Sequence, residues 1–454
     1  MHEIVVFGAG LVAAPLVDYL LKQPGFRVTV ASRTVSKAKA LVGDAENGKA
    51  IEFTIDQKDK LDELVRTHDL AVSLLPYTHH VQIAERCIAH KKHLVTTSYV
   101  SDAMGELDSR ARDADIILLN ESGLDPGIDH MSAMKIIHDV QARGGRIASF
   151  TSFCGGLPAP DSNTNPFGYK FSWSPRGVLL AGTNSAHFRE NGEDVHIDSK
   201  DLFTSNRKMV IQGLGEFEGY PNRNSIPYKD IYGIQDTETI LRGTLRYPGW
   251  CATLKAIVDL DLLNQDPRPE FSGTTYRELM AHLAGTSGEG VDGEGDVNPM
   301  DSATVRTSIA AQLGIDPATP LLDNFEWLGL FSETPLPQEP ANSLDHLCAL
   351  MESKMQYAGG ERDMIALQHN FIADMGNGTK EHITSTLIAY GIPGGYSSMA
   401  RTVGLPAAIA VKMILHGEIK EPGVHIPIKP TIYEPILAEL EKEGIRFEEL
   451  TEAA

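Results

Sequence analysis

Cysteine is scarce in this sequence, and the few cysteines stand far apart. Four of the 454 residues are cysteine, Cys87, Cys154, Cys251 and Cys348, and they form no C-x-x-C pair. Structural zinc sites need closely spaced ligands. The pattern argues against structural zinc and for a reducing compartment, so we expect a cytoplasmic protein without a bound metal.

Long apolar runs are also missing. No stretch approaches the roughly 18 apolar residues that cross a bilayer. The first strand pattern begins at Glu3, which leaves no room for a secretory signal. Positive charge is in the minority, since 40 Lys and Arg stand against 61 Asp and Glu, a formal net charge of −21. Because such a balance opposes binding to polyanions, we expect no nucleic-acid partner and no membrane partner.

The composition is otherwise that of a globular, soluble protein. Hydrophobic residues make up 42% of the chain and charged residues 22%, which suffices for an ordinary core. A chain of 454 residues exceeds the usual size of one domain. Length therefore predicts two or three domains.

The first 120 residues alternate between strand and helix patterns. A β-rich run ends at Phe7 and is followed by Gly8-Ala9-Gly10-Leu11-Val12-Ala13 and an amphipathic segment through Lys22. This matches G-x-G-x-x-G/A, in which the glycines form a turn that admits a pyrophosphate to the helix N-terminus. Further strand candidates follow at residues 27–31, 50–54, 70–75, 94–97 and 116–119. The alternation predicts a doubly wound parallel sheet that binds a dinucleotide.

The second strand candidate ends in Ser32-Arg33-Thr34. NAD-binding versions of this fold usually place an acid here to bind the ribose 2′-hydroxyl. A guanidinium between two hydroxyls suits a 2′-phosphate instead, which an acid would repel. A surface arginine on a loop is the alternative. We interpret the pattern as an NADP site.

Residues 120–130, Asn-Glu-Ser-Gly-Leu-Asp-Pro-Gly-Ile-Asp-His, are the stretch around which the chain is organised. Gly123, Pro126 and Gly127 force a sharp turn between the strand candidate and a helical pattern. Asp125 lies on that turn. Ligands bind beyond the carboxyl ends of parallel strands, so we predict the active site here. A turn-capping aspartate is the alternative for Asp125.

Arginines stand beside turn residues and aromatics farther along the chain. A strand is expected at residues 146–153 and, from its Pro and Gly density, a loop at 154–160. Arg223 and Arg246 can hold carboxylates bidentately. Salt-bridged surface arginines are the alternative.

The C-terminal half is dominated by helical patterns. A hairpin is expected around Asn377-Gly378, and a helix buried on all sides at 397–415. A further helix is expected at 435–443. A helical subdomain is predicted by the patterns at residues 253–263, 276–284, 304–313, 321–328 and 343–357.

Several longer motifs occur in one order along the chain. They are Gly8-Ala9-Gly10-Leu11-Val12, Ala31-Ser32-Arg33-Thr34, Leu74-Leu75-Pro76-Tyr77-Thr78, Thr97-Ser98-Tyr99, and residues 123–130, 154–160, 168–174 and 391–399. Together they resemble the glutamate-forming saccharopine dehydrogenases, or saccharopine reductases, over essentially the full chain. The resemblance implies NADPH-dependent reduction of the imine between 2-aminoadipate 6-semialdehyde and glutamate, or the reverse, oxidative cleavage of saccharopine.

The resemblance also implies the architecture. It implies an α/β protein with a Rossmann-type doubly wound parallel sheet, plus a mixed α/β substrate and dimerisation domain with an inserted all-helical domain. We expect the NADP-binding domain at residues 1–128 and 394–454, the mixed domain at 129–252 and 358–393, and the helical domain at 253–357. A homodimer is implied by the same resemblance.

Carried over position by position, the resemblance assigns site residues. The acid/base candidates are Asp125, Cys154 and Tyr99. The substrate contacts are Ser98, Tyr99, Asp125, Ser174, Arg223, Thr244, Leu245 and Arg246. The cofactor contacts are Gly8, Ala9, Gly10, Leu11, Val12, Ser32, Arg33, Thr34, Leu75, Thr97, Leu124, Asp125, Pro126 and Ser174, together with Thr54 and Ile55, where the family often has an acid.

The chemistry of the expected substrate fits these residue types. Saccharopine carries three carboxylates, an α-ammonium and a secondary amine, so its site needs several cations and one acid near the amine. The arginines and Asp125 supply these groups, while the nicotinamide carries the hydride. For Cys154 a small buried filler is the alternative. His79-His80 starts a helix without a nearby carboxylate, so neither a metal site nor a base is assigned to it.

Two other functions stay open at this point. The chain could reduce another amino-carbonyl imine, such as a carboxy-polyamine, for which Arg246 would be dispensable. It could instead be a non-catalytic NADP-sensing or scaffolding protein that keeps only the Gly-rich turn. The second alternative predicts loss of the polar site residues, yet Tyr99, Asp125, Cys154 and both arginines are present.

Overall fold

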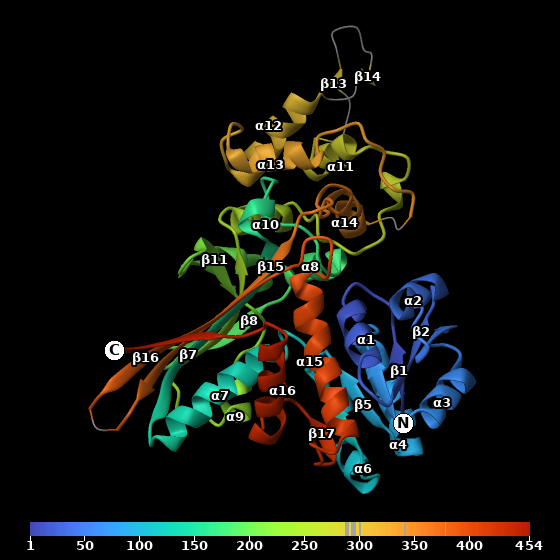
Figure 1. Cartoon of the computed structure of the whole chain (residues 1–454). Helices are drawn as coiled ribbons and strands as arrows, with labels where there is room; N and C mark the ends of the chain where they lie inside the picture. The colour runs from blue at the N-terminus through green and yellow to red at the C-terminus, as the bar shows by residue number, and fades with distance from the viewer. Residues whose placement is uncertain (287–289, 292–296, 299–300, 340–341, 377) are drawn as a thin grey trace. The chain divides into compact units, whose positions relative to one another are not determined.

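The computed structural model describes the chain from Met1 to Ala454 except residues 287–289, 292–296, 299–300, 340–341 and 377 (Figure 1). The described chain divides into two compact units. The first unit comprises Met1–Ser152, Asp230–Asp236 and Arg362–Ala454, and the second comprises Phe153–Lys229 and Thr237–Glu361. The three-domain division expected from the resemblance stays a prediction.

The first unit contains a seven-stranded parallel sheet in the order β17-β6-β5-β4-β1-β2-β3. This order confirms the Rossmann-type fold. All six N-terminal strand predictions are confirmed, and β17 from the C-terminal segment adds a strand beside β6. The strands are β1 (His2–Phe7), β2 (Phe26–Ser32), β3 (Gly48–Glu52), β4 (Leu70–Ser73), β5 (His93–Thr96), β6 (Ile117–Leu119) and β17 (Gly423–His425).

Helices cover both faces of this sheet, which is why most of its strands are continuous apolar runs. Val5 and Phe7 of β1 are fully buried and pack in one cluster with residues of α3 (Lys58–Thr67) and α4 (His80–His90). α15 (Ser398–Leu415) packs against β4, β5 and α1 (Ala13–Leu21). The remaining connections contain α2 (Val35–Val42), α5 (Asp102–Gly105) and α6 (Asp108–Asp113).

Helix α15 is buried on nearly all sides, as the sequence predicts. A Cβ at Gly404 would lie 2.8 Å from the carbonyl oxygen of Val12, so only glycine allows α15 to approach α1 this closely. By length and composition α15 could cross a membrane, and 78% of it is buried inside the protein. A helix buried in the core of a protein can have the same length and apolar composition.

The first unit also contains an antiparallel group of strands. β15 (Asp363–Asp374) and β16 (Lys380–Tyr390) form the predicted hairpin, and β18 (Glu448–Ala453) pairs with β16. Asn377, predicted in the hairpin turn, lies outside the described residues. The helices here are α7 (Ile128–Ala142) and α16 (Pro430–Lys442), and α16 begins at a proline five positions before the predicted start.

The second unit combines antiparallel strands with the predicted helices. The strands are β8 (Ala186–Glu190), β9 (Glu193–Ile197), β10 (Arg207–Ile211), β11 (Gly215–Pro221), β12 (Thr239–Arg246) and the short pair β13 (Gly290–Val291) and β14 (Val297–Asn298). The helices are α8 (Pro175–Ala181), α10 (Trp250–Asp259), α11 (Tyr276–Leu283), α12 (Ser302–Leu313), α13 (Pro320–Leu328) and α14 (Ser343–Lys354), while the short α9 (Tyr228–Ile231) ends in the first unit. All five helical patterns predicted between residues 253 and 357 are therefore confirmed.

The predicted loop at residues 154–160 is wrong for most of its length. Strand β7 (Arg146–Pro158) continues through it, so Cys154 lies on a strand. Glycine occupies position 155 because β12 lies very close there: a Cβ at Gly155 would lie 2.6 Å from the carbonyl oxygen of Leu245 in β12. Glycine in a strand often marks such a close approach of another backbone.

Candidate active site

The Gly-rich turn between β1 and α1 is built as a dinucleotide site requires. Gly8 has φ +114, and a Cβ there would lie 3.1 Å from the carbonyl oxygen of Leu74. At Gly10 a Cβ would meet no atom within 4 Å, so the backbone is open on that side. Ala13 is fully buried, which lets the helix pack on the strand. The turn thus leaves room for a pyrophosphate at the helix N-terminus. The other cofactor contacts predicted in this turn are Ala9, Leu11 and Val12.

Arg33 follows β2 at the same edge of the sheet and is exposed. Among the described residues it has no hydrogen bond and no ion pair. The neighbouring Ser32 hydroxyl accepts a hydrogen bond from the Thr34 N–H at 3.2 Å, which holds the loop. A cation left without an internal partner beside two hydroxyls fits a 2′-phosphate.

The two cofactor contacts predicted after β3, Thr54 and Ile55, differ in their surroundings. The Thr54 N–H donates to the Gln57 side chain at 3.2 Å. Ile55 packs against the buried cluster that contains Val5 and Phe7, and so does Leu75, which follows β4. These two residues offer apolar surface rather than polar groups.

The turn at residues 123–127 is folded tightly on itself. Gly127 has φ +145, and a Cβ there would lie 2.1 Å from the carbonyl oxygen of Gly123. The Gly123 N–H donates to the Pro126 carbonyl at 3.0 Å. A Cβ at Gly123 would lie 3.3 Å from Thr97 Cβ, so the turn also lies against the loop that follows β5. Position 127 therefore requires glycine, and a side chain at position 123 would be tightly crowded by its neighbours.

Asp125 is the chemically accessible residue of this stretch. Every other residue from Asn120 to His130 is buried, including Leu124 and Pro126. The Tyr99 hydroxyl donates to Asp125 Oδ1 at 2.9 Å. The structure thus brings two predicted acid/base residues together at the carboxyl ends of β5 and β6. A part-exposed carboxylate held by a phenol can exchange a proton with a bound ligand.

Ser98, a predicted substrate contact next to Tyr99, is hydrogen-bonded to the buried side chain of His80. The His80 ring is buried and lies 2.9 Å from both Ser73 Oγ and Ser98 Oγ. Burial, with a smaller contribution from His79, lowers the pKa of His80 to about 4. The ring is therefore neutral at neutral pH and orients Ser98. No group of His, Cys, Asp and Glu in the part of the chain that the structure describes is arranged to hold a metal ion.

In the second unit Arg246 is a buried cation enclosed by aromatic rings. Its side chain is 5% exposed, and its guanidinium carbon lies 4.9 Å from the Tyr169 ring centre and 5.3 Å from that of Trp250. One guanidinium nitrogen donates to the Leu245 carbonyl at 2.8 Å. Its Nε meets no acceptor among the described residues.

A buried cation is costly unless it is paired. Within the described residues Arg246 forms no ion pair, so its guanidinium is available to an anionic group such as a carboxylate. Tyr169 and Trp250 were not predicted as site residues. Tyr169 does lie in the motif at residues 168–174, but nothing local in the sequence links it to an arginine about 77 positions later in the chain.

The other predicted residues of the second unit differ in exposure. Cys154 is 8% exposed, and the side chain of Leu245 is fully buried. Thr244 is the part-exposed residue of β12. Ser174 caps α8 through a hydrogen bond from the Gly177 N–H at 3.2 Å. Arg223 is exposed and has φ +56.

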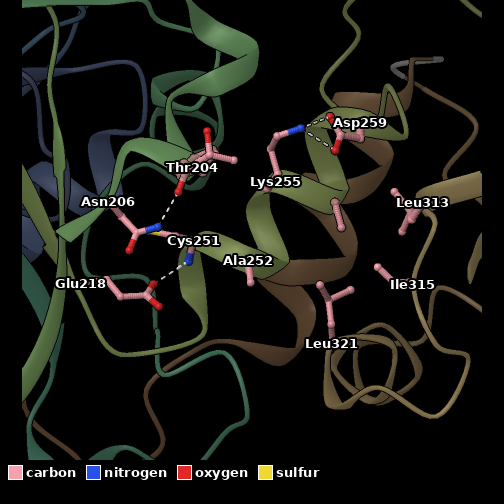
Figure 2. A pocket seen from close by; sticks show the side chains of 12 residues that line it. Thr204, Asn206, Glu218, Cys251, Ala252, Lys255, Asp259, Leu313, Ile315 and Leu321 are labelled. Carbon is pink, nitrogen blue, oxygen red and sulfur yellow. Dashed lines mark hydrogen bonds and ion pairs between the residues drawn. The ribbon is translucent and has the colours of Figure 1, made fainter. Parts of the chain in front are cut away.

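A cavity of about 480 Å³ elsewhere in the second unit contains none of these residues (Figure 2). It is lined by α10 and by residues near the ends of α12 and α13. Its polar groups are already paired: Glu218 accepts from the Gly249 and Cys251 N–H groups, and Lys255 binds Asp259. Burial and Glu218 raise the pKa of Cys251. The lining therefore carries no obvious catalytic group.

Comparison with known proteins gives matches over the whole chain. Residues 4–119 match the saccharopine dehydrogenase NADP binding domain, and residues 123–445 match the saccharopine dehydrogenase C-terminal domain. The chain is 43% identical over 455 residues to saccharopine dehydrogenase (NADP(+), L-glutamate-forming) of Schizosaccharomyces pombe, with 99% of each chain covered. It is 42% identical over 453 residues to the Saccharomyces cerevisiae protein of that name, again with 99% of each covered.

A solved structure agrees with the sequence relatives. Apo saccharopine dehydrogenase (L-Glu forming) from Saccharomyces cerevisiae has 41% identity and a TM-score of 0.90, with 100% of both chains covered. Alpha-aminoadipic semialdehyde synthase of Bos taurus is 40% identical over 98% of this chain, which corresponds to 47% of that longer protein.

Proposed function

Because the chain belongs to the saccharopine dehydrogenase family, we propose that Tyr99, Asp125 and Cys154 manage protons at its active site while Arg223 and Arg246 bind substrate carboxylates. The enzyme is an NADP-dependent, L-glutamate-forming oxidoreductase. It interconverts saccharopine, NADP and water with glutamate, 2-aminoadipate 6-semialdehyde and NADPH. The carboxy-polyamine and NADP-sensing alternatives are not favoured.

One observation carries the assignment of residues. Asp125 is the part-exposed residue of an otherwise buried stretch, and the Tyr99 hydroxyl orients its carboxylate. This pair lies at the same sheet edge as the Gly-rich turn and Arg33. A carboxylate at this place can take the proton of the secondary amine as the C–N bond is oxidised.

The chain's residues have distinct tasks in the oxidative direction. When bound, NADP supplies the hydride acceptor. Arg246 and Arg223 hold carboxylates, and Ser98, oriented by His80, adds a hydrogen bond. Asp125 takes the amine proton as the C–N single bond becomes an imine. Cys154 or Asp125 then assists water in adding to the imine carbon and returns a proton to the nitrogen, so that the C–N bond breaks and glutamate leaves.

Measurement of NADPH formation tests the reaction and its alternatives together. The protein is incubated with NADP and, separately, with saccharopine, lysine, glutamate or carboxynorspermidine. NADPH is expected to form only in the reaction that contains saccharopine. Formation with carboxynorspermidine instead would assign the site to a carboxy-polyamine. NADP binding without turnover of any compound would support the sensing function.

We also propose that the protein acts in the cytoplasm as a homodimer. Its four cysteines are free thiols, which suits a reducing compartment. The dimer is proposed from the family resemblance. Sedimentation analysis of the purified protein tests it, and a monomeric mass at micromolar concentration would contradict it.

A further inference from the structure

A glutamate and a histidine form a buried pair directly behind the Tyr99 and Asp125 loops. Glu121 is 5% exposed and His130 is 0% exposed. Glu121 Oε2 lies 2.7 Å from His130 Nε2. Neither side chain reaches the surface where a substrate binds, and neither has a task in the reaction described above. Two ionisable groups this deeply buried are rare unless they are paired.

Glu121 holds the backbone on both sides of Tyr99. Its N–H donates to the Ser98 carbonyl at 3.1 Å, and its Oε1 accepts from the Val100 N–H at 2.9 Å. Glu121 has φ +55, a conformation that residues other than glycine rarely adopt. The two hydrogen bonds to Ser98 and Val100 stabilise this backbone conformation. The backbone and the carboxylate of Glu121 thus hold the residues on either side of Tyr99.

His130 connects the same carboxylate to the Asp125 turn. The other ring nitrogen of His130 lies 2.5 Å from the Tyr232 hydroxyl and 3.6 Å from Asp129 Oδ2. Asp129 Oδ1 in turn accepts from the Gly127 N–H at 2.6 Å. The pair thus contacts the Tyr99 loop through Glu121 and the Asp125 turn through Asp129.

We propose that Glu121 and His130 are a positioning pair that holds Tyr99 and Asp125 in the mutual orientation needed for proton transfer. Because reacting groups must be aligned closely, a small shift of the Tyr99 hydroxyl would leave the Asp125 carboxylate misoriented. The inference rests on the roles proposed above for Tyr99 and Asp125. It adds two residues that act through them.

A double-mutant cycle tests this dependence. Glu121→Gln keeps the shape of the side chain but removes its charge, and Tyr99→Phe removes the hydroxyl that the pair is proposed to position. Glu121→Gln alone is expected to lower kcat roughly 10- to 100-fold and to leave KM for NADP unchanged. In the Tyr99→Phe background, the same substitution should lower kcat by a much smaller factor, because the part of its effect that passes through the Tyr99 hydroxyl is already lost. Equal effects in both backgrounds would overturn the proposal.

Tyr232→Phe provides a milder second variant in case Glu121→Gln folds poorly. It keeps the ring and the Glu121–His130 contact but removes one hydrogen bond to the histidine. We expect kcat to fall about threefold or more with KM for NADP unchanged. A wild-type kcat for both Tyr232→Phe and a folded Glu121→Gln would overturn the proposal.

Glu439→Gln is the matched control. Glu439 is a part-buried glutamate of the first unit with a tyrosine and two lysine partners, and it contacts neither Tyr99 nor Asp125. It should lower thermal stability without lowering kcat. If Tyr99→Phe itself keeps wild-type kcat, the proposed role of Tyr99 fails and the positioning pair fails with it. If Tyr99→Phe lowers kcat but Glu121→Gln does not, the positioning pair alone fails.

Discussion

The Tyr99 hydroxyl lies 2.9 Å from Asp125 Oδ1, so a phenol from the loop after β5 donates to a carboxylate from the turn after β6. The two residues are 26 positions apart in the chain. They meet because β5 and β6 are parallel neighbours whose carboxyl ends share one edge of the sheet. The proposed proton chemistry depends on this pair.

Asp125→Ala removes the carboxylate from that pair. We expect kcat to fall by about 10²- to 10⁴-fold if Asp125 is a positioned acid/base. Steady-state kinetics with saccharopine check this, with circular dichroism to confirm the fold. A folded variant with near wild-type kcat would leave Asp125 with a structural role only.

Arg246→Ala removes the buried guanidinium that is proposed to bind a substrate carboxylate. KM for saccharopine should rise far more than KM for NADP, because the contact is common to the ground and transition states. Arg207→Ala in the same unit is the control, since Arg207 is already paired with Glu190 and is only partly buried. Equal increases in both KM values for Arg246→Ala would count against the assignment.

Gly10→Ala tests the open face of the Gly-rich turn. A Cβ at this position meets no protein atom, so the melting temperature should stay near that of the wild type. KM for NADP should rise at least about tenfold, because the methyl group occupies the path of the pyrophosphate. Gly359→Ala, where a Cβ also meets no atom, is the control. Unchanged KM for NADP would contradict the placement of the phosphates.

Glu439 makes the first unit sensitive to acid. Hydrogen bonds from Lys412 and then Lys442 lower the pKa of Glu439 from 4.5 to about 2. Because its folded pKa is depressed, its contribution to stability is full above pH 4.5 and is lost as the pH falls toward 2. With screening by solvent, wild type should lose about 1 kcal/mol more than Glu439→Gln between those pH values. Denaturant unfolding at both pH values checks this, and parallel losses would refute it.

Arg33 sets the expected preference for NADP over NAD. A charge-assisted hydrogen bond contributes about 1.5 to 3 kcal/mol, which corresponds to roughly one to two orders of magnitude in kcat/KM. Ser32→Asp with Arg33→Ala should erode or reverse the preference, because the new carboxylate repels the phosphate and accepts from a 2′-hydroxyl. Both cofactors are compared at fixed ionic strength. An unchanged preference in the double variant would make Arg33 a surface residue without a role.

Local patterns in the sequence predict the parallel sheet and most helices well. Most strands of the parallel sheet are buried apolar runs bounded by turn residues, and such runs can be recognised in the sequence without knowledge of their partners. β12 was missed because nearly all its residues are buried, so it shows no alternation. β18 is exposed along its whole length and forms by pairing with β16. No local pattern in the sequence predicts such a strand.

The site was predictable where its residues belong to motifs. Asp125 stands out because Gly123 and Gly127 force a turn after a strand. The prediction of a loop at Cys154 was wrong because Gly155 allows β12 to lie close to β7 and does not form a turn. The aromatic rings around Arg246 and the Glu121–His130 pair depend on tertiary contacts, so sequence periodicity could not reveal them.

Product analysis tests the central claim most directly. Wild-type enzyme is supplied with saccharopine and NADP, and NADPH, glutamate and lysine are quantified over time. The account predicts one glutamate for each NADPH, with 2-aminoadipate 6-semialdehyde as the other product and no lysine. Lysine in place of glutamate, or NADPH formation without cleavage of saccharopine, would contradict it.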